Sequence, residues 1–462
     1  MLRIYDTKSR DLATISSKSP VTIYACGPTV YRDVHLGNLR SFLLPDLVRT
    51  ALASANISAD VVQNITDVGH MADDTGLEAT DPSQDKMLQQ AEKENLTALD
   101  IARKYEAQYF HDLTALNVQL PDQTPRASET IDLMIEVIEK LIDLGFAYQG
   151  EDGSVFFSAE KFPSYGAISG NTLAQLKPGH RFDGEVNAAK RFHGDWALWK
   201  VSDERRTQLT WDTPWGRGFP GWHIECTAMS LNAFGDQIDI HTGGIDLRFP
   251  HHENERAQSN SLTGKEVVGA WVHAEHLLFE GRKMSKSTNN VVLLKDVMAA
   301  NISPAAVRLV FLENHFRQQL NLTWDTLVAA EQTIRRWSDQ VAAAKNQDAE
   351  LKAEMSGQLL NNLNTAEAVL ALRAKEKSLA KSPQARADAI ATAADLLKLN
   401  LTAAELDLPE QVQSLLTART EARAEKNWDQ SDKLRDELTS LGYEVSDASS
   451  GTQLRRAILP PA

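Results

Sequence analysis

The chain has 462 residues, of which 24% are charged, and a formal net charge of −15. This length predicts two to four globular domains, and the sequence contains neither an uncharged apolar run that could span a bilayer nor the apolar segment of a signal peptide at its polar N-terminus. The negative charge argues against indiscriminate nucleic-acid binding but leaves room for a local basic face, and two distant cysteines predict a cytoplasmic protein without a disulfide framework.

Strand and helix patterns alternate at the start of the chain. VTIYAC is an apolar, β-rich run that predicts a buried strand ending at Cys26. After GPT and HLGN, apolar residues over 36–52 recur at helical spacing, and Pro45 is expected to kink this helix. ADVVQNITDV predicts a second buried strand. This order predicts a doubly wound parallel sheet with ligands at the carboxyl ends of its strands, where Cys26, His35 and Thr66 fall.

The middle of the chain predicts helices and an insertion. Residues 69–93 are acidic and polar, and predict a surface excursion with no core of its own. Helices are expected over 98–116 and 128–144, with Ser128 as the N-cap of the second. Short strand and turn patterns over 148–213 predict an insertion between two halves of a nucleotide-binding domain. QIDIHTGG and GAWVHAEHLLFEG then predict strands that return to the sheet.

The C-terminal third predicts helices throughout. From Ser303 onward apolar residues recur at helical spacing, LDLPEQ is a candidate linker, and the last segment has a charged two-helix pattern with a short tail. The predicted domain limits are 1–116 and 214–302 for the two halves of the nucleotide-binding domain, 117–213 for the insertion, 303–405 for an all-α helical bundle and 406–462 for a small C-terminal domain.

A candidate metal site lies in the stretch that runs from GWHIEC to FPHHENE. Pro250 fits the first turn of a helix, on which His251 and Glu255 are four residues apart and share one face. An imidazole and a carboxylate with the Cys226 thiolate suit Zn²⁺, and Cys26 would complete the set if the fold brings it close. The alternative is that both cysteines and the neighbouring histidines are core residues, because the cysteines form no C-x-x-C pair.

Two further motifs suit a nucleotide. In HLGN, His35 could donate to a phosphate at a helix start, and Gly37 allows close approach, although an ordinary helix cap is the alternative. In GRKMSKS, Lys283 and Lys286 suit the transition state at an α-phosphate, whereas a solvated basic turn is the alternative. The occurrence of both motifs on either side of an insertion favours the nucleotide.

HTGGIDLRF is a third candidate for nucleotide binding. Gly243 and Gly244 would let an adenine or ribose lie against the backbone, with Asp246 accepting a hydroxyl. A plain turn is the alternative reading of the two glycines.

The HLGN and KMSKS pair resembles the two signatures of class I aminoacyl-tRNA synthetases. YACGPTVY, NITDV, DWALWK, TPWGRG, GWHIEC, GGIDLRFPHHENE and the terminal EARAEKNWDQSDKLRDEL narrow the resemblance to cysteinyl-tRNA synthetases, over nearly the whole chain. The resemblance implies a Rossmann-like α/β catalytic domain with an inserted connective subdomain, followed by a stem-contact or anticodon-binding bundle and a small anticodon-recognition domain.

The resemblance also implies an activity. L-cysteine would be activated with ATP and Mg²⁺ to cysteinyl-adenylate and transferred to the 3′ end of tRNA(Cys) by a monomer, with one Zn²⁺ selecting the thiolate. The implied zinc ligands are Cys26, Cys226, His251 and Glu255. The implied cysteine pocket is Gly27, Thr29, Asn64, Thr66 and Trp222. The implied catalytic residues are His35, Asn38, Lys283 and Lys286, and the implied ATP site is His35, Gly37, Gly244, Asp246 and Lys286.

The sequence departs from the family pattern at several positions, and two other functions stay open. Leu36 replaces Ile, Phe219 replaces Arg, and Leu454 stands where an aromatic is often seen. KMSKS is followed by Thr288, Asn289 and Asn290 where Leu-Gly-Asn is usual. One alternative is a ligase that passes cysteine to a glucosaminyl-inositol amine, as in mycothiol biosynthesis. The other is a non-catalytic tRNA-binding paralogue.

Overall fold

The computed structural model describes residues 1–15, 19–68, 85–176, 189–284, 290–402, 408–448 and 451–460. Within these ranges, no helix combines the length and apolar composition needed to cross a membrane. A hairpin of β1 (Arg3–Asp6) and β2 (Asp11–Thr14) opens the chain.

A four-stranded parallel sheet in the order β10-β9-β3-β4 positions the site. Its strands are β3 (Val21–Ala25), β4 (Ala59–Gln63), β9 (Ile238–Gly244) and β10 (Val268–Ala274). Central apolar residues of three strands, Ile23, Val61 and Ile240, are aligned in register and buried, as expected for a parallel sheet covered on both faces. The predicted α/β fold with a parallel sheet is therefore confirmed.

Two helices connect β3 to β4 where one kinked helix was predicted. They are α1 (Leu36–Phe42) and α2 (Leu44–Ser54), and Leu43 separates them. Pro45 stands in the first turn of α2, where its missing N–H leaves no hydrogen bond unmade. Proline thus begins the second helix instead of bending the first.

The segment after β4 departs from prediction in two places. The predicted excursion over 69–93 lies partly outside the described residues, but its end is the helix α3 (Lys86–Glu94), with a buried apolar face at Met87 and Ala91. The next helix, α4 (Ala98–Ala115), is as expected. Ser128 does not cap the following helix, because its hydroxyl donates to Asp67 (2.6 Å) and α5 (Ile131–Asp143) begins later.

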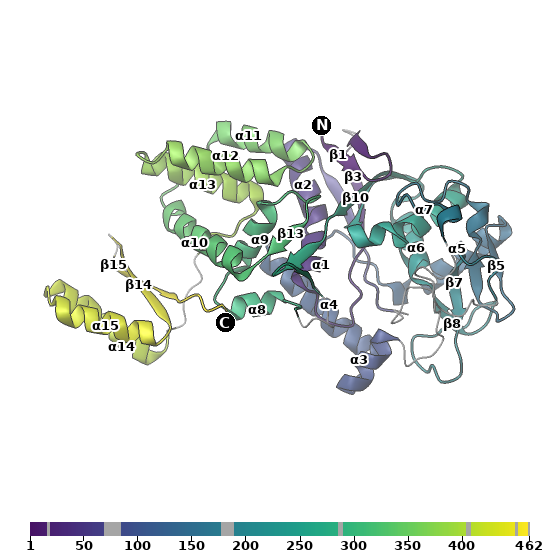
Figure 1. The fold of residues 1–462 in the computed structure, drawn as a ribbon, viewed down its shortest axis with the longest axis horizontal. Coiled ribbons are helices and arrows are strands. Elements are labelled where there is room, and N and C mark those ends of the chain that lie inside the picture. The colour runs from purple at the N-terminus through teal and green to yellow at the C-terminus, as the bar shows by residue number, and fades with distance from the viewer. Residues whose placement is uncertain are drawn as a thin grey trace.

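The insertion folds as a separate antiparallel sheet beside three helices. Its strands are β5 (Ala147–Gln149), β6 (Val155–Phe157), β7 (Trp196–Val201) and β8 (Gly218–Pro220), in that order. The helices α6 (Trp222–Phe234) and α7 (His251–Thr263) pack against each other and against α5. Figure 1 shows these elements gathered at one end of an elongated molecule.

The strands β11 (Leu277–Phe279), β12 (Arg282–Lys283) and β13 (Leu320–Leu322) form a small sheet, and β13 interrupts the helical run expected after Ser303. The helices of this region are α8 (Leu294–Ala299), α9 (Pro304–Leu312), α10 (Trp324–Val341), α11 (Ala349–Leu360), α12 (Thr365–Ser378) and α13 (Pro383–Leu397). At the end of the molecule opposite the insertion lie α14 (Glu410–Ala424), α15 (Trp428–Ser440), β14 (Tyr443–Ala448) and β15 (Gly451–Arg456) (Figure 1). The predicted tail is therefore partly a β-hairpin.

Candidate functional site

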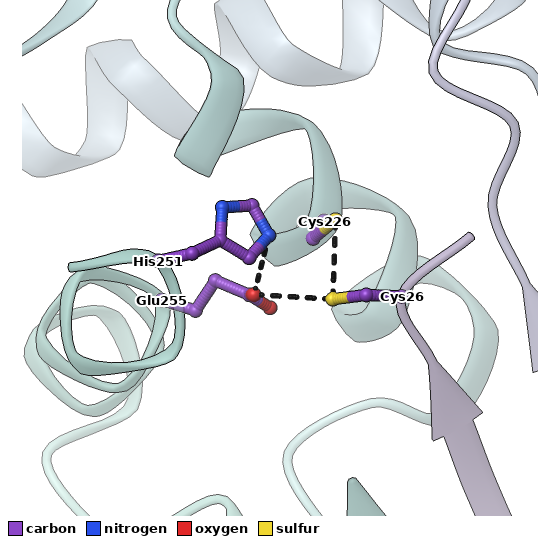
Figure 2. Close-up of side chains that lie close together, drawn as sticks. All are labelled: Cys26, Cys226, His251 and Glu255. Atoms are coloured by element: carbon purple, nitrogen blue, oxygen red, sulfur yellow. Dashed lines mark hydrogen bonds and ion pairs between the residues drawn. The ribbon is translucent and has the colours of Figure 1, made fainter. Parts of the chain in front are cut away.

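Four predicted ligands from three parts of the chain meet beneath the end of β3. Cys26 directly follows β3, Cys226 lies on α6, and His251 and Glu255 lie on α7, all with their side chains directed at one point (Figure 2). Their donor atoms lie within 4.8 Å of one another, and all four residues are buried. The Sγ atoms of the two cysteines are 3.9 Å apart, and Cys26 Sγ is 3.5 Å from Glu255 Oε1.

These distances fit a tetrahedral zinc site. Zinc–ligand bonds of about 2.3 Å to sulfur and 2.1 Å to oxygen would place two sulfurs about 3.8 Å apart and a sulfur and an oxygen about 3.6 Å apart. His251 Nε2 lies 2.9 Å from Glu255 Oε1, so this pair would separate by roughly half an ångström around an ion. Within the described residues, this buried nitrogen makes no hydrogen bond of good geometry, so its short contact with Glu255 is an ion pair that a metal ion between the two atoms would replace.

Further histidines orient the predicted ligands. His223 Nδ1 lies 2.8 Å from His251 Nδ1, and His241 Nε2 lies 2.9 Å from the second oxygen of Glu255. The ring of Trp222 lies 4.1 Å from the ring of His251, measured between centroids. Such outer hydrogen bonds fix the tautomer and orientation of metal ligands, so the donor set is held in place by its surroundings.

The structure also offers a second donor set that sequence reasoning missed. Cys26 and Glu255 lie close to His241 and His252 as well, with His252 Nε2 3.3 Å from Cys26 Sγ. From the sequence, both histidines could equally be ordinary core residues. The position of His241 near the carboxyl end of the predicted strand could have indicated a role in the site. Its closeness to Cys26, however, depends on the register of β3 and β9, which the sequence does not reveal.

The charges in the cluster are strongly coupled. Burial disfavours charge on every member, but His241 and His251 hold the pKa of Glu255 well below its usual value. Despite burial, Glu255 and Cys226 raise the pKa of His251 to about 10. The pKa of Cys26 is raised by burial and by the hydrogen bond that its thiol donates to Cys226. Burial acts in the same direction on Cys226, but this hydrogen bond outweighs it and lowers the pKa of Cys226 to about 6. Without a metal, the cluster therefore holds the Glu255 carboxylate and the Cys226 thiolate beside a protonated His251, and a bound metal ion would take the place of the histidine proton.

A cleft of about 310 Å³ opens above the cluster. Of the predicted pocket and nucleotide residues, those on its lining are Gly27, Thr29, Asn38, Trp222, Gly243, Gly244 and Asp246, together with the ligand Cys26. Asn64 and Thr66 lie behind this lining and hold it: Asn64 Oδ1 accepts from the Gly27 N–H (2.9 Å), and Asn64 Nδ2 donates to Thr66 Oγ1 (3.0 Å). A Cβ on Gly27 would lie 1.6 Å from the Asn64 carbonyl oxygen, so only glycine fits there.

The HLGN motif forms the start of α1. His35 Nδ1 accepts from the Asn38 N–H (3.2 Å), and Asn38 Oδ1 accepts from the His35 N–H (3.4 Å). Burial and the nearby Arg32 lower the pKa of His35 to about 4, so the ring is neutral at pH 7 and its Nε2 carries the proton. His35 and Gly37 lie just outside the lining of the cleft.

The described part of KMSKS, Lys283 and Met284, lies near HLGN. Lys283 ends β12 and is exposed, whereas Lys286 lies outside the described residues. The chain that follows the loop runs beside the first motif, because the Leu36 N–H donates to the Val292 carbonyl (3.1 Å). Met284 of KMSKS lies 3.6 Å from the position of a Cβ on Gly37. The fold thus brings the two motifs together across the sequence between them.

Comparisons with known proteins agree with this geometry. A family model of the class I (C) tRNA synthetase catalytic domain matches residues 12–332, and one of the cysteinyl-tRNA ligase anticodon binding domain matches residues 405–455. The cysteine–tRNA ligase of Chlamydia caviae is 36% identical, covering 98% of each chain. That of Thermus thermophilus is 38% identical, covering 98% of this chain and 99% of the relative.

Solved structures share the fold at much lower identity. Methionyl-tRNA synthetase of Mycobacterium tuberculosis bound to methionyl-adenylate is 15% identical, with a TM-score of 0.57 over 96% of this chain and 99% of that one. The LeuRS of Agrobacterium radiobacter is 9% identical, with a TM-score of 0.56 over 83% of each chain. At these identities the likeness concerns the fold alone.

Proposed function

The chain belongs to the cysteinyl-tRNA synthetase family of class I aminoacyl-tRNA synthetases, and on this basis we propose that it ligates L-cysteine to tRNA(Cys) with ATP. The observation that carries the proposal is the meeting of two thiols, an imidazole and a carboxylate in one buried cluster, whose member Cys26 lines the cleft together with Asn38 of HLGN. The donor set suits binding of the thiolate of an amino acid through a metal, and the motif suits binding of a phosphate. Because they lie close together, one site could hold both substrates.

Zinc is the ion that the donor set favours. Cys26, Cys226, His251 and Glu255 would hold it, because two sulfurs, a nitrogen and an oxygen suit a borderline-soft cation. When bound, zinc would supply a soft Lewis acid that ligates a thiolate in preference to the hydroxyl of serine. The set with Cys226 is preferred over the set with His241 and His252 because it contains two thiolates instead of one.

The pocket residues would orient the amino acid. Gly27 leaves room beside Cys26 because a side chain is excluded there, and Thr29 is aligned with Thr66 by a bridge between the two loops. Trp222 lines the cleft, and its ring packs against the ring of His251. Orientation of this kind accounts for much of the rate of a reaction that needs no covalent protein nucleophile.

The motif residues would handle the nucleotide in two steps. First, a carboxylate oxygen of cysteine attacks the α-phosphorus of ATP with Mg²⁺, and pyrophosphate leaves with the electrons of the broken bond. The neutral His35 can donate from Nε2 to a phosphate oxygen, while Lys283 and Lys286 balance the charge and Asp246 accepts a ribose hydroxyl. Then a hydroxyl of the terminal adenosine of tRNA attacks the carbonyl carbon, and AMP leaves.

The C-terminal unit would bind tRNA. The match of the anticodon binding domain to residues 405–455 favours tRNA as the acceptor over a sugar amine. The presence of Lys283, His35 and four metal ligands favours a catalyst over a binding paralogue. The domain limits given above, the monomeric state and the cytoplasmic location stay predictions.

The test has two stages. Purified protein of measured zinc content should catalyse cysteine-dependent exchange between ATP and pyrophosphate, and the paralogue is supported instead if no exchange is seen with zinc bound. Transfer of cysteine to tRNA(Cys) and to a glucosaminyl-inositol acceptor is then compared. Transfer to the sugar amine alone would contradict the proposal.

A further inference from the structure

A cationic wall of the cleft is unused by the function proposed so far. Tyr31 and Arg32 line the cleft from the segment between β3 and α1, and Lys86 lines it from the start of α3. The guanidinium carbon of Arg32 lies 5.1 Å from the centroid of the Tyr31 ring, and Lys86 Nζ lies 5.9 Å from the same centroid. Two cations therefore flank one aromatic ring on the lining of the cleft.

The charge of Arg32 is not neutralised by the described part of the protein. Two carboxylates, Asp33 and Asp246, share the lining with it. Asp33 lies 2.5 Å from Lys295 Nζ, so that ion pair occupies it, and no described carboxylate lies within ion-pair distance of Arg32. A half-buried guanidinium without an anionic partner favours binding of an anion, and its fork of N–H donors suits phosphate oxygens.

The position of this wall indicates which anion. Cys26 and Trp222 mark the part of the cleft assigned to cysteine, while Gly244 and Asp246 mark the part assigned to the nucleoside. The part of the lining that is assigned to neither cysteine nor the nucleoside is the cationic wall at Tyr31 and Arg32. Arg32 is close enough to His35 to contribute to the lowered pKa of that ring, so it lies near the motif that handles the phosphates.

We propose that Arg32 is a further substrate-binding residue that holds the β- and γ-phosphates of ATP and the pyrophosphate that leaves. This inference rests on the proposed function, because it places the polyphosphate of that reaction. As the carboxylate oxygen bonds to the α-phosphorus, the bond from the α-phosphorus to the bridging oxygen breaks, and negative charge develops on the pyrophosphate. The guanidinium of Arg32 stabilises that charge, and its cation–π contact with the Tyr31 ring holds the side chain in position.

The experiment measures binding of inorganic pyrophosphate with Mg²⁺ to the full chain by calorimetry. In Arg32→Ala the dissociation constant should rise about tenfold, and Arg32→Lys should retain part of the affinity. The matched control is Arg191→Ala, whose guanidinium carbon lies 4.0 Å from the Tyr148 ring centroid in the insertion, outside the cleft lining. In exchange assays, KM for ATP should rise in Arg32→Ala while KM for cysteine stays within twofold of wild type.

The inference is overturned if Arg32→Ala binds pyrophosphate within twofold of wild type, or if Arg191→Ala loses as much affinity. Thermal unfolding of each variant shows whether the fold is intact, and Arg32→Lys keeps the test valid if Arg32→Ala unfolds. A failure of the proposed function would instead be seen as absent cysteine-dependent exchange in the wild-type protein. The two failures are therefore distinguishable.

Discussion

At the scale of single residues, Glu255 is a ligand in both of the possible metal sites. One of its oxygens faces Cys26 and His251, and the other accepts from His241. Both donor sets contain Cys26 and Glu255, so substitution of either residue cannot distinguish them. The distinguishing residues are the two neighbours on α7, His251 and His252, which belong to different sets.

We predict that His251→Asn loses bound zinc and that His252→Asn retains it. Loss of one ligand should lower metal affinity by at least the 10- to 100-fold typical of an outer-shell change. Purified variants are compared with wild type by elemental analysis after dialysis against a weak chelator, and wild type should hold about one ion per chain. Loss of zinc from His252→Asn together with retention by His251→Asn would show that the second donor set is the occupied one.

Gly27 tests the packing above the metal site. We predict that Gly27→Ala lowers cysteine-dependent exchange by roughly a hundredfold, because the new methyl would displace the Asn64 backbone and with it the pocket. The control is Gly357→Ala in α11, where a Cβ meets nothing within 4 Å. That helical substitution should stabilise the fold by about 0.5–1 kcal/mol and leave exchange unchanged. Comparable activity of the two variants would contradict the role of Gly27.

The sequence allowed some of these residues to be predicted. His251 and Glu255 were accessible because helical spacing alone puts them on one face, whereas Cys26 needed the strand order to be known. His252 and His241 were left undecided because buried histidines occur in many cores. Arg32 was missed because nothing local distinguishes it from a solvated arginine, and its isolation from carboxylates exists only in three dimensions.

At the scale of elements, a buried ion pair joins the catalytic sheet to the bundle. Arg308 Nη2 on α9 lies 2.8 Å from Asp46 Oδ2 on α2, and Lys398 Nζ lies 2.6 Å from the other oxygen. Arg308 also donates to the carbonyls of Leu116 and Leu397, at the ends of α4 and α13. One guanidinium thus holds four helices together.

We predict that Asp46→Asn lowers the free energy of unfolding by about 3 kcal/mol, because it leaves Arg308 charged and buried. Burial raises the pKa of Asp46, but Arg308 and Lys398 outweigh it and lower the folded-state pKa below the usual value. The stability from this group is therefore present above the unfolded-state pKa of about 4 and is lost as pH falls through the folded-state pKa.

The measurement is thermal unfolding of wild type and Asp46→Asn over a series of acidic pH values. The difference between the two proteins should be largest near neutrality and shrink below about pH 4. The control is Asp339→Asn, because Asp339 forms an ion pair with Arg455 at the surface, where such pairs contribute about 0–1 kcal/mol. A constant difference at every pH would rule out the ionised carboxylate as its cause.

Helices and strands were predicted correctly where a local sequence pattern determines their limits. They were predicted poorly where a contact between distant residues determines them. The apolar runs of β3 and β9 and the long pattern of α4 were found from periodicity. The helix α3 was missed because its polar sequence buries only Met87 and Ala91. Ser128 was assigned as a cap because Asp67, which its hydroxyl contacts instead, is distant in the sequence.

At the scale of the whole molecule, β3 and α1, beside which the cleft opens, lie apart from α14 and α15 at the end of the molecule (Figure 1). Between them the bundle contacts both, and Arg335 on α10 bonds to Glu444 of β14 (2.9 Å) and to the Arg456 carbonyl (3.1 Å). A single tRNA would span this distance. Adenylate formation and tRNA binding should therefore respond to different substitutions.

Trp428 at the start of α15 tests this separation. It is 55% exposed, and the guanidinium carbon of Arg423 lies 5.6 Å from its ring centroid, which suits stacking on an unpaired base. We predict that Trp428→Ala weakens tRNA(Cys) binding roughly tenfold and leaves exchange unchanged. Leu370→Ala on α12, where the side chain is 54% exposed, serves as the matched control and should bind normally. Filter binding at fixed salt measures both, and a parallel loss of exchange would contradict the separation.

The most direct measurement is amino-acid-dependent exchange between ATP and pyrophosphate with cysteine and with serine, before and after removal of zinc. We predict exchange with cysteine, a rate with serine lower by roughly ten-thousand-fold or more, and loss of the cysteine reaction on chelation with recovery when zinc returns. Comparable rates with the two amino acids, or undiminished exchange in metal-free protein, would contradict the assignment of the buried cluster as the site that distinguishes sulfur from oxygen.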